Sequence, residues 1–88
     1  MEILLSKQAE KDFKKAPEYI QRKLILRLTQ IETEGLKLDK DIHKVTLPSI
    51  PNSYVLRIDH KFRAVGVKES TEEGQEVFIL QGIGIRPD

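Results

Sequence analysis

The chain has 88 residues and contains no cysteine. Without cysteine a disulfide scaffold and a thiolate metal site are both excluded, and the composition suits a reducing compartment. Long apolar runs are also missing, since no stretch approaches the ~20 residues that cross a bilayer. The N-terminus does not have the charged-then-apolar layout of a signal peptide. We therefore expect a cytoplasmic protein that has no membrane partner.

An excess of one charge sign is absent as well. Charged residues make up 33% of the chain, yet the formal net charge is only +1. A non-specific nucleic-acid coat would be strongly basic, so the composition argues against one. The charges are nevertheless unevenly spread, because cations dominate the middle of the chain and an acidic stretch follows. The cations are Lys37, Lys40, Lys44, Arg57, Lys61, Arg63 and Lys68, and the acidic residues after them are Glu69, Glu72, Glu73 and Glu76.

The length predicts one domain that spans residues 1–88. A chain this short buries only about 60% of the surface that its unfolded form exposes. We therefore expect a thin core and a modest free energy of unfolding. The chain has no internal repeats and no low-complexity segment.

The N-terminal part predicts a strand followed by a helix. Residues 2–5 form a short apolar run, which is typical of a strand. Ser6 is a suitable N-cap, and the apolar residues of 7–16 recur on one helical face. Pro17 ends this helix and suits the first turn of a second one.

The second helix has the clearest pattern in the sequence. Its apolar stripe consists of Ile20, Leu24, Leu28 and Ile31, and we expect Ile25 to widen it. Gly35 stands where a C-terminal cap belongs. Residues 36–53 then read as a long connection with a short strand at Lys44–Leu47. Long connections in small domains are often functional.

From Tyr54 onward the apolar pattern alternates with a period of two. This predicts strands at 54–59, 62–68 and 76–82, separated by turns. The expected order is β-α-α-β-β-β. We therefore predict an α+β fold in which two N-terminal helices pack on an antiparallel β-sheet.

The register of the first hairpin decides where its arginines lie. Pairing Ile58 with Phe62 buries the apolar residues of both strands and sets Arg57 beside Arg63 on the open face. A slip of one residue would instead place Arg63 beside Ile58. Two neighbouring arginines repel each other unless an anion lies between them, and a phosphate matches the guanidinium geometry.

Several short segments together resemble one protein family. In chain order they are AEKDFKK at 9–15, the long helix, HKV at 43–45, YVLRIDHKFRA at 54–64 and IGIR at 83–86. In this order and at these spacings they resemble the RelE/ParE superfamily of type II toxins, over nearly the whole chain. The resemblance implies the RelE-like fold, which is the one expected above.

The resemblance also implies an activity. RelE-like members are mRNA interferases, endoribonucleases that cut mRNA in the ribosomal A site without a metal and so inhibit translation. The ribose 2′-OH attacks the adjacent phosphate. The chain is then expected to be the toxin of a type II toxin-antitoxin system, with no cofactor and no metal. Its partners would be a cognate antitoxin, the ribosome and mRNA.

Three arginines match the family's basic site residues. Arg57 and Arg63 match residues on two neighbouring strands, and Arg86 matches the arginine after the closing strand. The resemblance implies that all three bind and stabilise the phosphate. We expect Lys44 and Lys61 to bind RNA.

The C-terminus departs from the family pattern. Relatives often carry a histidine just before the last arginine and a tyrosine several residues after it. Here the first position is Ile85, and no tyrosine follows before Asp88. His60 lies in the hairpin turn beside the arginines, and an imidazole side chain is able to transfer protons, so His60 is the candidate for proton transfer.

Two other functions stay open at this stage. A ParE-like inhibitor of DNA gyrase acts through protein contact and also does without the histidine and tyrosine. A catalytically weakened relative would bind only an antitoxin. The Arg57 and Arg63 pair favours the nuclease, because a gyrase inhibitor does not need a phosphate site.

Overall fold

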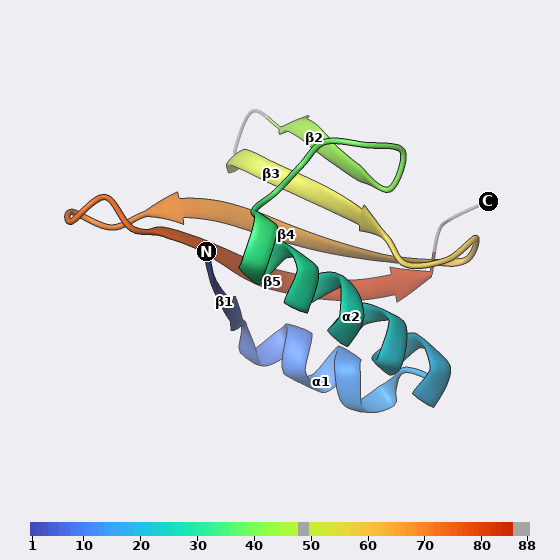
Figure 1. Cartoon of the computed structure of the whole chain (residues 1–88). Helices are drawn as coiled ribbons and strands as arrows, with labels where there is room; N and C mark the ends of the chain where they lie inside the picture. The colour runs from blue at the N-terminus through green and yellow to red at the C-terminus, as the bar shows by residue number, and fades with distance from the viewer. Residues whose placement is uncertain (48–49, 86–88) are drawn as a thin grey trace.

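Two helices lie against one face of a five-stranded sheet (Figure 1). The structure is a computed structural model that describes residues 1–47 and 50–85. In chain order the elements are β1 Glu2–Leu5, α1 Lys7–Lys15, α2 Glu18–Glu34, β2 Ile42–Leu47, β3 Ile50–Arg57, β4 Phe62–Ser70 and β5 Glu76–Ile85. The predicted α+β class, with both N-terminal helices on the sheet, is confirmed.

The sheet differs from the prediction because it is mixed. Its strand order is β1-β5-β4-β3-β2, and the pairs β2–β3, β3–β4 and β4–β5 are antiparallel. The first strand instead runs parallel to β5, with Glu2 opposite Val77 and Leu5 opposite Leu80. The two helices that follow β1 carry the chain back over the sheet, so β1 is free to take this direction.

The predicted long connection contains a second hairpin. The predicted short strand is longer and begins at Ile42, and β3 begins at Ile50 rather than at Tyr54. The β2–β3 register shifts between Val45 and Leu47. The described pairing of β3 with β4 starts only at Ser53, so the residues before it, including a proline, need no partner on that side.

The helix ends follow the predicted capping residues. The hydroxyl of Ser6 accepts a hydrogen bond from the Ala9 N–H at 3.1 Å, and it donates one to the Gln81 carbonyl at 3.1 Å. Ser6 therefore caps α1 and also joins it to β5. Gly35 ends α2 with a φ of 84°, a value that favours glycine. Within the described ranges neither helix combines the length and apolar character that a membrane span requires.

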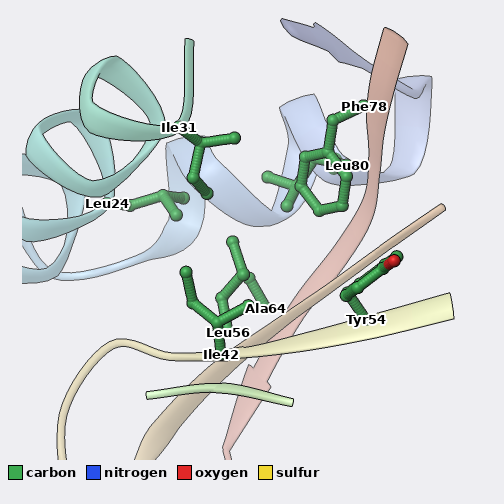
Figure 2. Packing of buried hydrophobic residues seen from close by; sticks show 9 residues of the cluster. Leu24, Ile31, Ile42, Tyr54, Leu56, Ala64, Phe78 and Leu80 are labelled. Atoms are coloured by element: carbon green, nitrogen blue, oxygen red, sulfur yellow. The ribbon is translucent and has the colours of Figure 1, made fainter. Parts of the chain in front are cut away.

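The core lies between α2 and the inner face of the sheet. Figure 2 shows Leu24 and Ile31 of α2 opposite Leu56 of β3 and Phe78 of β5, and all four are buried. The ring of Tyr54 meets that of Phe78 edge-on, with centroids 6.4 Å apart. The predicted stripe on α2 is thus buried at Ile20, Leu24 and Ile31. The prediction for Ile25 was wrong, because its side chain is 52% exposed.

Asp12 joins α1 to the last strand. Its Oδ2 accepts the Ile83 backbone N–H at 3.0 Å, and its Oδ1 accepts the Gln8 side-chain amide at 2.8 Å. The hydrogen bond from Ile83 is the main reason that the pKa of Asp12 lies below its ordinary value, and the bond from Gln8 adds to it. The ionised carboxylate therefore fixes β5 one residue before Gly84.

We expect the free energy of unfolding to fall in acid partly because of Asp12. Its pKa is lower in the folded chain, so its contribution is complete above the ordinary pKa of 3.8 and is lost as the pH falls through the folded pKa. Asp12→Asn keeps an acceptor for Ile83 but cannot titrate. Urea unfolding between about pH 2 and pH 6 should show a weaker pH dependence for this variant.

Glu10→Gln is the matched control, because Glu10 is an exposed carboxylate on the same helix. This variant should keep the pH dependence of the wild type. Identical profiles for Asp12→Asn and the wild type would show that the carboxylate does not hold β5.

Candidate functional site

The β3–β4 hairpin carries the predicted site, and its register is the predicted one. Leu56 pairs with Ala64, and both are buried on the helix side of the sheet. One residue further along β3, Arg57 pairs directly with Arg63 on β4. The turn closes with the Ile58 N–H donating to the Phe62 carbonyl at 3.0 Å.

Asp59 builds the turn that joins the two arginine strands. Its Oδ1 accepts the backbone N–H groups of Lys61 at 2.8 Å and Phe62 at 2.7 Å. Desolvation by burial opposes ionisation of this carboxyl, but the hydrogen bonds from Phe62 and Lys61, with the charges of His60 and Lys23, outweigh it and lower its pKa. Asp59 thus organises the turn, while His60 and Lys61 stay exposed on it.

The two arginines have no carboxylate to neutralise them within the part of the chain that the structure describes. Neither side chain forms an ion pair or a hydrogen bond there. Arg57 is exposed and Arg63 is partly buried. Directly opposite residues on antiparallel strands have Cβ atoms about 5 Å apart, where like charges destabilise the sheet. A bound anion with several oxygens would remove this repulsion, so the pair suits a phosphate.

The strand beside the arginines has little side-chain bulk. Across β4 and β5, Arg63 is opposite Gly84 and Val65 is opposite Gly82. Because cross-strand partners point to the same face, the arginines border a strip without side chains on the open face. A ligand bound by the arginines could therefore approach the β5 backbone closely.

The structure separates two neighbouring residues of β2. Lys44 pairs with Tyr54, whose ring is buried on the helix side, so the predicted RNA-binding residue Lys44 does not lie on the face of the arginine pair. His43 pairs with Val55 and therefore shares the open face with Arg57. The sequence did not identify His43 as a site residue, because the β2 register depends on the shift after Val45.

The C-terminal part of the predicted site is described only up to Ile85. Arg86 lies outside the described residues, so its role stays a prediction. Ile85, which is 67% exposed, is opposite Phe62 at the end of β5. Among the described residues no three histidine, aspartate or glutamate side chains gather in a way that could hold a metal ion.

No protein-family model matches this chain. No curated protein is similar enough in sequence to match it either.

Solved structures share the fold over nearly the whole chain. A YoeB/ParE toxin from Agrobacterium tumefaciens superposes with a TM-score of 0.76 at 8% identity, covering 99% of this chain and 100% of its own. YoeB from Staphylococcus aureus, solved as a dimer, gives 0.74 at 20% identity, with 99% and 98% covered. RelE from a RelE-RelB complex of Pyrococcus horikoshii gives 0.73 at 17%, with 97% and 93% covered. The chain therefore has the fold of the RelE/ParE toxins.

Proposed function

We propose that this chain is the toxin of a type II toxin-antitoxin system and that it cuts mRNA on the ribosome. The observation that carries the proposal is the cross-strand pair of Arg57 and Arg63, which has no neutralising partner among the described residues. The fold shared with RelE and YoeB toxins supports the toxin role. A toxin that acts on ribosomes would work in the cytoplasm.

The proposed reaction needs no external reagent. The ribose O2′ attacks the adjacent phosphorus, the O2′–P bond forms and the P–O5′ bond breaks. The products are a 2′,3′-cyclic phosphate and a free 5′-hydroxyl. A base takes the 2′ proton and an acid supplies one to O5′. Arg57 and Arg63, with Arg86 as a proposed third cation, stabilise the charge that grows on the phosphate oxygens.

Two histidines are candidates for the proton transfers. His60 is on the turn between the arginine strands, and His43 is on β2 on the same face as Arg57. Both are exposed, and an imidazole can give or take a proton near neutral pH. Lys61, beside His60, is proposed to contact the RNA backbone.

A second candidate function is ParE-like inhibition of DNA gyrase. The observation that favours it is Ile85, an exposed aliphatic side chain where RelE-like proteins often carry a histidine. Without that histidine the site has fewer groups for proton transfer. A relative with weakened catalysis that binds only its antitoxin is the remaining alternative.

One experiment separates the three functions. Purified protein is added to ribosomes that translate a defined mRNA, and cuts are mapped by primer extension, while gyrase supercoiling is assayed in parallel. The nuclease proposal expects cuts at A-site codons and none in the same mRNA without ribosomes. Loss of supercoiling without cuts would establish gyrase inhibition. A folded protein that does neither would be an antitoxin-binding relative.

A further inference from the structure

A cavity of about 260 Å³ lies between α2 and the end of β3. It is lined by Lys23, Leu26, Arg27 and Gln30 of α2 and by Arg57 and Ile58. Arg57 thus belongs both to the arginine pair and to this cavity. The other lining residues have no part in the proposed cleavage site.

The cavity lining carries cations and no carboxylate. Arg27 is already neutralised, because its Nη2 lies 3.1 Å from Asp41 Oδ2. Lys23 and Arg57 have no ion pair within the described ranges. The carboxylate of Asp59 interacts with Lys23 through space, but backbone N–H groups already occupy it. Lys23 and Arg57 are therefore two cationic lining residues that no carboxylate pairs with inside the described ranges, which suits an anionic ligand.

The same region also has exposed apolar surface. Leu26 is 72% exposed, more than any other large hydrophobic residue that the structure describes. Tyr19 and Ile25 on the same helix are 51% and 52% exposed. A bound phosphate would not bury the apolar side chains of Leu26 and Ile58. Exposed apolar side chains beside cations are instead typical of a surface that binds protein.

We infer that this cavity anchors an acidic amphipathic segment of a protein partner. A carboxylate of the segment would bind between Lys23 and Arg57, and an apolar residue one helical turn away would cover Leu26 and Ile58. The inference rests on the proposed function only in naming the antitoxin as that partner. It places the antitoxin contact beside α2 rather than on the open face of the sheet.

This location gives the partner a direct effect on the arginine pair. A carboxylate bound to Arg57 in the cavity competes with an RNA phosphate for the same guanidinium. Arg57 is then no longer available to RNA on the open face, although the partner does not cover that face. The partner would therefore inhibit RNA binding by engaging Arg57 with a carboxylate, without blocking access to the sheet.

The test uses the full chain labelled with ¹⁵N and a synthetic helical peptide that repeats leucine and glutamate at i, i+4 spacing. A peptide with lysine in place of glutamate is the charge control. The acidic peptide should shift the amide signals of Leu26, Gln30 and Ile58, and the lysine peptide should not. Lys23→Glu should weaken the acidic peptide about tenfold. Lys11→Glu, the same change at an exposed position on α1, should leave binding within about twofold.

Four results would overturn the inference. Peptide shifts confined to Val65, Gly82 and Gly84 would move the contact to the open face. Equal binding of the lysine peptide, or no binding of the acidic one, would remove the charge argument. An RNA oligonucleotide that shifts Leu26 and Gln30 in the same way would make the cavity a nucleic-acid site. None of these readings uses mRNA cleavage, so failure of the nuclease proposal leaves the result interpretable.

Discussion

Replacing Arg63 with alanine is expected to lower the rate of ribosome-dependent mRNA cleavage by about 100-fold or more. The guanidinium is proposed to stabilise the charge that develops on phosphorus, and removal of one such group typically costs 10² to 10³ in rate. Arg63 makes no ion pair within the described part of the chain, so its loss should leave the free energy of unfolding nearly unchanged. The rate is measured by primer extension on ribosome-bound mRNA.

Two further variants separate charge from geometry. Arg63→Lys keeps the positive charge but cannot form bidentate hydrogen bonds to a phosphate, so this variant should retain only part of the cleavage activity. Arg22→Ala is the control, because Arg22 is exposed on α2 and pairs with Glu18. Arg22→Ala should cleave like the wild type. Cleavage by Arg63→Ala within about threefold of the wild type would exclude the arginine pair as the catalytic site.

Gly66→Ala is expected to lower the free energy of unfolding by about 3 kcal/mol. A Cβ added at Gly66 would lie 2.2 Å from Cζ of Phe78 and within 2.8 Å of two more ring atoms. Phe78 is fully buried, so its ring cannot move toward solvent. The expected loss is a large share of the roughly 5–15 kcal/mol that stabilises a domain. Urea unfolding followed by circular dichroism gives the value.

A smaller side chain at position 78 should relieve the clash. Phe78→Leu alone opens a cavity and lowers the free energy of unfolding. In the double variant with Gly66→Ala, the loss of this free energy should be smaller than the sum of the losses in the two single variants. Gly84→Ala is the matched control, since a Cβ there would meet nothing within 4 Å and the glycine has no positive φ. Additive losses in the double variant would contradict this account of Gly66.

The hairpin at the candidate site could be predicted from sequence because one register satisfies its apolar residues. Pairing Ile58 with Phe62 buries the hydrophobic side of both strands, and any shift by one residue would expose it. That constraint also placed Arg57 beside Arg63, as the structure has it. The start of α1 and the end of α2 were also predictable from sequence. Serine is a preferred N-cap residue and glycine a preferred residue at a helix C-terminus, and Ser6 and Gly35 hold these positions.

Other features depend on contacts between distant segments. The parallel pairing of β1 with β5 joins residues about seventy-five positions apart, and a four-residue apolar run does not specify its partner. The β2 register decides that His43, rather than Lys44, lies on the open face, and it depends on an irregularity between Val45 and Leu47. Ile25 fits the apolar stripe of α2 by spacing, but spacing alone does not show which side chains the sheet covers, and Ile25 is 52% exposed.

The position of β5 between β1 and β4 has a consequence for synthesis on the ribosome. Residues 1–34 form one strand and two helices whose apolar faces pack partly on β5, which is translated after β2, β3 and β4. Until residues 76–85 leave the ribosome, β1 lacks the strand that it pairs with, and the apolar face of α2 lacks part of the sheet that it packs on. The sheet can therefore be completed only after β5 has been translated, because the β1–β5 contacts that close it are distant in sequence. During this interval the nascent chain exposes its apolar surfaces to a chaperone or a partner before the two arginine strands are locked into a finished sheet.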